Sequence, residues 1–212
     1  MASRALWVCL LAGPLLVAAD TDLDHVLKSV ERRYNSAKTL KVFFTETYTV
    51  NGRARSESGE LTLRKPGRMR WDYKSPAGKL FLSDGKDVYL YTPDNNRVEK
   101  MKLKESEDMR APLAFLLGKL DFAKEFRDFQ FKPEAQGFEI TAKAKSDKLP
   151  YQQVDMHVAA DFSIHKLVIT NQDQSILTFD LSQETLNPAV ADTQFRFQMP
   201  AGATLVNEEA AQ

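Results

Sequence analysis

The 212-residue chain has one cysteine, three histidines and no long apolar stretch after residue 19. Its single cysteine, Cys9, lies inside the first apolar stretch, so the remainder has no thiol for a disulfide or for cysteine catalysis. The histidines are far apart, and neither the HxxxH nor the CxxC spacing of a metal site is present. We therefore predict that the protein has no metal site. No later stretch reaches the roughly twenty apolar residues of a membrane helix, so we also predict that the protein does not span a membrane.

Charge of one sign is lacking as well. The chain has 29 Lys and Arg residues against 29 Asp and Glu residues. Residues 1–19 contain Arg4 and no acid, so the rest of the chain has 28 basic and 29 acidic residues. A chain this close to neutral lacks the electrostatic footprint of a nucleic-acid-binding protein. The basic cluster at positions 64, 65, 68 and 70 could hold an anion, but among short strands it is more typical of an exposed polar face.

Catalytic motifs are absent too. The sequence has no GxSxG, no glycine-rich phosphate loop and, beyond Cys9, no cysteine nucleophile. Most acidic residues lie in expected turns or on polar faces, which is typical of solvated side chains. A glycosidase with paired carboxylates stays open, because such pairs are assembled in space and leave no linear spacing. We therefore predict a protein that is not an enzyme and needs no cofactor.

The N-terminus, by contrast, carries a clear pattern. Arg4 precedes an apolar stretch over residues 5–19 that ends in Val-Ala-Ala, with small residues where a signal peptidase cuts. The valine before Cys9 does not fit a lipoprotein processing site. A buried N-terminal helix is the alternative. We predict a cleaved signal peptide over 1–19, a single domain over 20–206 and a flexible tail over 207–212.

Residues 58–100 read as a meander of short antiparallel strands, with expected strands at 59–64, 68–73, 79–83, 88–92 and 98–103. Apolar residues recur there with a period of two, so each strand presents one apolar face. Between two of these strands, Asp84-Gly85 suits a tight hairpin, because glycine tolerates positive φ. On the apolar side of the expected sheet we place Leu61, Leu63, Met69, Trp71, Leu80, Leu82, Val88 and Leu90.

The flanking regions extend the same pattern. A helix beginning near Thr21 has one apolar face, and residues 40–50 form another alternating strand. At least five further strands follow residue 129, and we place Val154 and Met156 on the same apolar side. Phe195 and Phe197 predict a last edge element. The sequence thus predicts one mainly β domain, built on a large sheet whose single apolar side is covered by helices.

Residues 104–126 interrupt the strand rhythm. Pro112 suits the first turn of a helix. The following residues are apolar nearly all round, which indicates a short helix that is buried or covers a cavity. We call this segment the lid and assign to it Leu113, Phe115, Leu116, Leu117 and Leu120.

Four motifs in order resemble those of the outer-membrane lipoprotein carrier family, the LolA-type periplasmic chaperones. They are GEL at 59–61 with KPGRMRW at 65–71, SDG at 83–85 with VYLYTP at 88–93, PLAFLLG at 112–118, and FRF at 195–197 with PAG at 200–202. Each motif is weak alone, but the four in order are together strong, and the resemblance as a whole runs from the first helix to Gly202.

The resemblance implies a fold of about eleven antiparallel strands in an incomplete β-barrel, with helices covering its concave apolar face. It also implies a task in the periplasm: triacylated lipoproteins are accepted from an inner-membrane ABC exporter and passed to an outer-membrane acceptor. The acyl chains would lie in the apolar cavity formed by the residues assigned above, and we expect the carrier to act as a monomer.

Lys65 is where this sequence departs from the family. Many members have arginine at this position, where it bonds lid backbone carbonyls and holds the lid shut. The resemblance therefore makes Lys65 the expected lid latch, although lysine lacks the planar five-donor fork of arginine.

Two other functions fit the same predicted sheet. One is a carrier of a glycolipid or another free lipid, and the other is a sensor or scaffold domain that binds a protein partner. Bound lipoprotein, bound free lipid, or a bound protein without lipid would distinguish the three.

Overall fold

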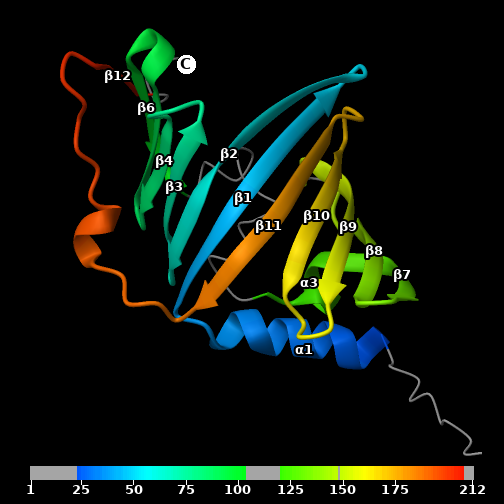
Figure 1. The fold of residues 1–212 in the computed structure, drawn as a ribbon. Coiled ribbons are helices and arrows are strands. Elements are labelled where there is room, and N and C mark those ends of the chain that lie inside the picture. The colour runs from blue at the N-terminus through cyan, green and yellow to red at the C-terminus, as the bar shows by residue number, and fades with distance from the viewer. Residues whose placement is uncertain (1–22, 104–119, 148, 208–212) are drawn as a thin grey trace, which may run out of the picture.

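The computed structural model describes residues 23–103, 120–147 and 149–207 (Figure 1). One helix, α1 (Leu23–Ser36), precedes the strands, and a short one, α3 (Phe122–Glu125), lies among them. The strands are β1 (Thr39–Val50), β2 (Arg53–Arg64), β3 (Arg68–Ser75), β4 (Leu80–Asp84), β5 (Asp87–Thr92), β6 (Arg97–Lys102), β7 (Phe126–Glu134), β8 (Gly137–Ala144), β9 (Tyr151–Ala159), β10 (Ile164–Asn171), β11 (Ile176–Leu186) and β12 (Thr204–Asn207). Two 3₁₀ turns, η1 (Pro93–Asn95) and η4 (Asp192–Phe195), complete the described elements.

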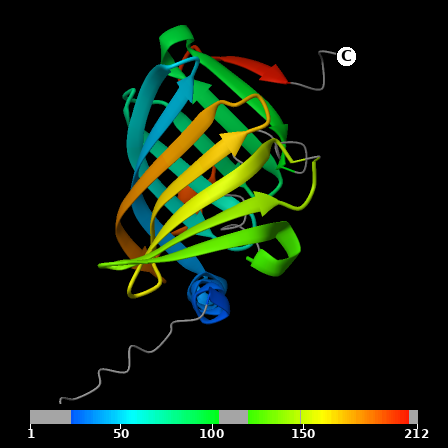
Figure 2. The same cartoon turned by 90° about the vertical axis from the view of Figure 1, so that its right-hand side faces the viewer.

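All twelve strands form one sheet, in the order β12-β6-β5-β4-β3-β2-β1-β11-β10-β9-β8-β7. Neighbours are antiparallel except for β12, which runs parallel to β6. The sheet curves strongly, and β7 and β12 are its two edges (Figure 2). The mainly β fold and the incomplete barrel predicted from the sequence are therefore confirmed.

The C-terminal part differs from the expected arrangement of about eleven strands. Phe195 belongs to η4 and not to an edge strand, and its side chain is buried. The last strand is β12, which pairs Thr204–Asn207 with residues 97–100 of β6. The sequence analysis assigned the two phenylalanines of the FRF motif to an edge strand because they are two positions apart. The same spacing also occurs in an irregular segment that packs on the outside of a sheet. Residues 1–22 and 208–212 lie outside the described residues.

The sheet turns one face inward, and a single large apolar core fills this concave side. The helix α1 lies across one end of the sheet (Figure 1), and its apolar face, with Val26, Val30 and Tyr34, is buried in that core. This confirms that α1 is amphipathic and covers part of the concave face.

Gly59 of the GEL motif is needed for the close approach of β2 and β3. A Cβ atom at this position would lie 2.1 Å from the carbonyl oxygen of Asp72, which is far inside van der Waals contact. The pairing of the two strands also shifts register between Ser58 and Gly59. The motif glycine therefore has a steric reason in this sheet.

Residues 187–203, which we call the C-terminal strap, cross the outer face of the sheet before β12. Within the strap, η4 packs against β3 and β4, and Val190 and Phe195 are buried. The ring of Phe197 stacks on Tyr89 of β5 at 4.4 Å between centroids. Strands β3–β5 are therefore covered on both faces, with the core on one side and the strap on the other.

Candidate functional site

The concave face is lined by aromatic rings that contact one another across neighbouring strands. The ring of Phe44 on β1 lies 4.7 Å from Trp71 and 5.2 Å from Tyr73, both edge to face. Trp71, which is fully buried, also lies 5.9 Å from Phe179 of β11. Edge-to-face contacts at these distances add stability beyond the burial of area. The result is an aromatic wall, made of Phe44, Trp71, Tyr73 and Phe179, on the inside of the sheet.

Most of the residues assigned to the cavity from the sequence lie on this face. Seven are buried members of the concave core, and Leu90 packs against it while partly buried. The seven are Leu61, Leu63, Met69, Trp71, Val88, Val154 and Met156. Whether they contact acyl chains stays a prediction.

Two of the assigned residues, Leu80 and Leu82, are on the wrong face. In the register of β3 and β4, Phe81 is opposite Trp71, so Phe81 points to the concave side and both leucines point outward. Leu82 is nevertheless buried, because the C-terminal strap covers that outer face. Three successive apolar residues carry no period of two, so the sequence could not set the register, and one residue of shift inverts a strand.

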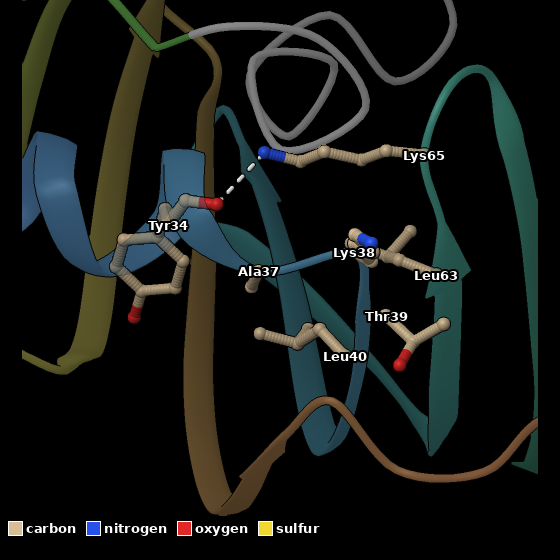
Figure 3. A pocket seen from close by; sticks show the side chains of 7 residues that line it. All are labelled: Tyr34, Ala37, Lys38, Thr39, Leu40, Leu63 and Lys65. Carbon is tan, nitrogen blue, oxygen red and sulfur yellow. Dashed lines mark hydrogen bonds between the residues drawn. The ribbon is translucent and has the colours of Figure 1, made fainter.

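Lys65 fastens the end of α1 to the end of β2 (Figure 3). Its Nζ donates a 2.8 Å hydrogen bond to the carbonyl oxygen of Tyr34 in the last turn of the helix. The same carbonyl accepts a 3.3 Å hydrogen bond from the N–H of Ala37, and the Lys65 cation adds a favourable charge at the C-terminal end of the helix. A small cavity of about 10 Å³, enough for about one water molecule, lies between Tyr34, Ala37, Leu40, Leu63 and Lys65. Partial burial lowers the pKa of the Lys65 ammonium.

A second fastening holds α1 to β11, which lies on the other side of β1 from β2. Arg33 forms an ion pair of 2.7 Å with Glu184 of β11. Glu184 also accepts a 2.7 Å hydrogen bond from the hydroxyl of Tyr34, and that hydroxyl accepts from the backbone N–H of Ile164 at 2.8 Å. Burial, together with the nearby Glu184 carboxylate, raises the pKa of Tyr34. The Tyr34 hydroxyl therefore stays neutral and satisfies a buried donor and an acceptor at once.

A third fastening joins α1 to the chain that follows the predicted lid. The side-chain amide of Asn35 accepts from the N–H of Leu120 at 2.7 Å and donates to its carbonyl oxygen at 2.8 Å. Glu31 accepts from the N–H of Phe122 at 2.8 Å. Leu120 and Phe122 are both buried in the concave core. The helix α1 is thus the common attachment for β2, β11 and residues 120–122.

The described residues show neither a metal site nor a membrane-spanning helix. Over 23–103, 120–147 and 149–207, no three His, Cys, Asp or Glu side chains are grouped to hold a metal ion. Within the same ranges no helix is both long and apolar enough to cross a membrane.

The family model for the outer membrane lipoprotein carrier protein LolA matches residues 35–198. The chain belongs to this LolA family.

Relatives of similar length bear this out. The chain is 30% identical over 199 residues to the outer-membrane lipoprotein carrier protein of Pectobacterium carotovorum, covering 93% of this chain and 94% of the relative. It is 30% identical over 207 residues to that of Bordetella avium, covering 96% of each. Among solved structures, an uncharacterized conserved protein from Thermus thermophilus shares the fold, with a TM-score of 0.55 and 10% identity over 87% of this chain and 98% of that one.

For a LolA-family chain, the bond made by Lys65 differs from the expected one. The acceptor in the structure is a carbonyl of α1, whereas the sequence prediction assigned the lid carbonyls. The lid residues Leu113, Phe115, Leu116 and Leu117 lie outside the described residues, so a latch between Lys65 and the lid stays a prediction. Leu120, the last residue assigned to the lid, is buried beside α1.

Sequence reasoning missed several residues that attach α1 to its neighbours or line the concave face. Asn35 and Glu184 carry no signal, because their partners are distant in sequence. A signal did exist at Glu46, where a charged residue occupies the position after Leu40, Val42 and Phe44 in the inward-facing period of β1. A charged residue at an inward-facing position shows that the concave face is not wholly apolar at this point.

Proposed function

We propose that this chain is a periplasmic carrier that takes triacylated lipoproteins from an inner-membrane ABC exporter to an outer-membrane acceptor, without catalysis. The observation that carries the proposal is the aromatic wall on the concave face of an open sheet, in a chain of the LolA family. Relatives such as the Bordetella avium protein carry the name outer-membrane lipoprotein carrier protein.

The physical demand on such a carrier is large. An acyl chain of about sixteen carbons costs about 12 kcal/mol to leave in water, at about 0.8 kcal/mol per CH₂ group. Three chains on one cargo molecule therefore need a continuous apolar surface. The concave core supplies aliphatic side chains on β2, β3 and β9 and aromatic rings on β1, β3 and β11.

Release is the second demand, because a carrier must also give its cargo up. In the proposed cycle the empty interior is filled by its own covering segments, and incoming acyl chains displace them. The segment assigned as the lid would be one cover and α1 the other. Refilling of the interior by these covers would then help to expel the chains at the acceptor.

The test is to purify the exported protein gently from cells that make triacylated lipoproteins and to identify what remains bound by mass spectrometry. Bound lipoprotein that passes to outer-membrane vesicles supports the proposal. Extractable free lipid without lipoprotein would favour a free-lipid carrier, and a bound protein without any lipid would favour a scaffold. Either result would overturn the proposed cargo.

A further inference from the structure

A polar groove lies on the outer face of the sheet, near its free edge at β7. Its floor is a row of four residues that are opposite one another in the strand register, one each from β7, β8, β9 and β10, the strands at the front of Figure 2. They are Arg127, Lys143, Gln153 and Thr170. The groove has a volume of about 330 Å³, which is in the range of small-molecule sites. We call it the outer groove.

The sheet itself separates the outer groove from the concave core. In β8, Ile140 and Ala142 belong to the core, so by the alternation of a strand Lys143 points outward. In β9, Val154 belongs to the core, and Gln153 before it points outward. A ligand in the outer groove would therefore not compete with acyl chains on the concave face.

Two connecting segments form the wall at the end of the strands. Asp147 lies between β8 and β9, and Gln172 lies between β10 and β11. The two connections are tied together, because the backbone N–H of Gln172 donates to the carbonyl oxygen of Pro150 at 3.0 Å. Gln152, at the start of β9, also lines the groove. Among the described lining residues, Ala144 alone is apolar.

Gln153 in the floor is oriented by a chain of hydrogen bonds. The hydroxyl of Thr141 donates to the carboxylate of Asp155 at 2.5 Å. The amide nitrogen of Gln153 donates to the two oxygens of the same carboxylate at 3.2 and 3.1 Å. The amide oxygen of Gln153 is left to accept from a ligand. A side chain that is held in place beforehand loses less freedom when a ligand binds.

The charges around the outer groove are balanced. Three basic and three acidic side chains of the described residues lie in its lining or beside it: Arg127, Lys143, Lys145, Asp128, Asp147 and Asp155. Arg127 pairs with Asp128 at 2.6 Å, and the ammonium of Lys145 bonds the carbonyl oxygen of Ala123. The side chain of Lys143 forms no hydrogen bond or ion pair with a residue in 23–103, 120–147 or 149–207. The groove therefore offers single charged groups without a field of one sign, and it favours neither an anion nor a cation.

We propose that the outer groove binds a neutral oligosaccharide. The lining offers three glutamine amides, one threonine hydroxyl, two basic groups and one carboxylate. An apolar ligand would leave these groups without the hydrogen bonds that water gives them. Sugar hydroxyls both donate and accept, so they can pair with amide, carboxylate and guanidinium groups alike. This inference does not depend on the proposed carrier function.

The experiment is an NMR titration of the full, ¹⁵N-labelled protein with tri-N-acetylchitotriose and, separately, with maltotriose. Each saccharide is added to about 10 mM, which would occupy most of a site with a Kd of about 1 mM. The backbone amides of Lys143, Gln153 and Thr170 should shift. The indole N–H of Trp71, on the concave face, should not shift, because the sheet lies between it and the groove.

Two variants and a matched control test the assigned residues. Gln153→Met keeps the length of the side chain but removes its amide, and it should raise the Kd about tenfold. Lys143→Met alters an exposed side chain and should raise the Kd about threefold, so it tests the proposal even if Gln153→Met fails to fold. Gln130→Met is the control, because Gln130 is opposite Thr141 on the same outer face but does not line the groove. It should leave the Kd unchanged.

Three results would overturn the proposal. The first is the absence of shifts at the groove with both saccharides, or shifts at Trp71 alone, which would put the sugar on the concave face. The second comes from inorganic phosphate as an anion probe: shifts of the groove amides with phosphate but with neither saccharide would show an anion site. The third is an equal Kd for folded Gln153→Met, Lys143→Met and Gln130→Met, which would place the binding elsewhere. Each of these results leaves the carrier function untouched.

Discussion

The Nζ atom of Lys65 donates to the last-turn carbonyl of Tyr34, and the removal of this donor has a clear expected result. Lys65→Met should cost about 1–2 kcal/mol of stability, because a charge-assisted bond to a carbonyl is lost. It should also speed amide hydrogen exchange in the last turn of α1. Lys65→Arg keeps a donor and should preserve protection. Lys38→Met removes the same charge from an exposed side chain nearby and serves as control.

The same pair of variants tests the proposed latch. If the Tyr34 bond helps to hold the covers in place, Lys65→Met should bind more of an apolar dye and release a labelled lipoprotein to acceptor membranes more slowly. Identical dye binding and transfer in the original protein, Lys65→Met and Lys65→Arg would remove Lys65 as a latch while leaving the carrier function untouched.

Tyr34 presents a second residue-scale case. Tyr34→Phe leaves the buried N–H of Ile164 without its acceptor and takes a donor from Glu184. An unsatisfied buried donor costs about 1–3 kcal/mol, so urea unfolding should show a loss of that size. Tyr91→Phe removes a half-buried hydroxyl bonded to Asn96 at 3.0 Å and should cost less. A smaller loss for Tyr34→Phe than for Tyr91→Phe would contradict the role assigned to the Tyr34 hydroxyl.

At the scale of elements, β4 decides which of its side chains meet the interior. The strand register puts Phe81 inside and Leu80 outside. A photoreactive phenylalanine analogue in place of Phe81 should cross-link to the acyl chains of bound lipoprotein. The same analogue in place of Leu80 should not, because the sheet itself lies between them. Mass spectrometry of the cross-linked product identifies the position that reacted. Cross-linking from position 80 alone would show that the cargo binds on the outer face of the sheet.

At the scale of the whole molecule, burial rather than ion pairing should hold the C-terminal strap on the sheet. Asp192 pairs with Arg64 and Arg68, but its side chain is 64% exposed, so Asp192→Asn should cost less than about 1 kcal/mol. Phe195 is buried on the outer face, and Phe195→Ala should cost about 3–5 kcal/mol. Urea unfolding of both variants measures the difference. A larger loss of stability for Asp192→Asn than for Phe195→Ala would show that ion pairing, and not burial, holds the strap.

The strand positions and the apolar side of most strands could be predicted from the sequence, because they depend on a period of two within a few residues. The alternation of Leu61 with Leu63 and of Met69 with Trp71 was enough to place them on the concave face. In β4 the same reasoning failed. The strap covers the outer face of β4, so apolar residues lie on both faces of this strand. An uninterrupted Leu80-Phe81-Leu82 run therefore has no period of two from which to read the register.

The sequence by itself thus determined the class of fold, the apolar faces of its regular strands and the amphipathic first helix, since each follows from local spacing. Only the tertiary structure decided which side β4 presents and that the strap leads into a parallel strand, β12. It also decided that Lys65 bonds the end of α1, and that Glu46 and Glu57 face each other on the inner side. These depend on contacts between residues that are far apart in the chain or on the register between strands. Their distances and partners are set only when the whole sheet has folded and curved around its core.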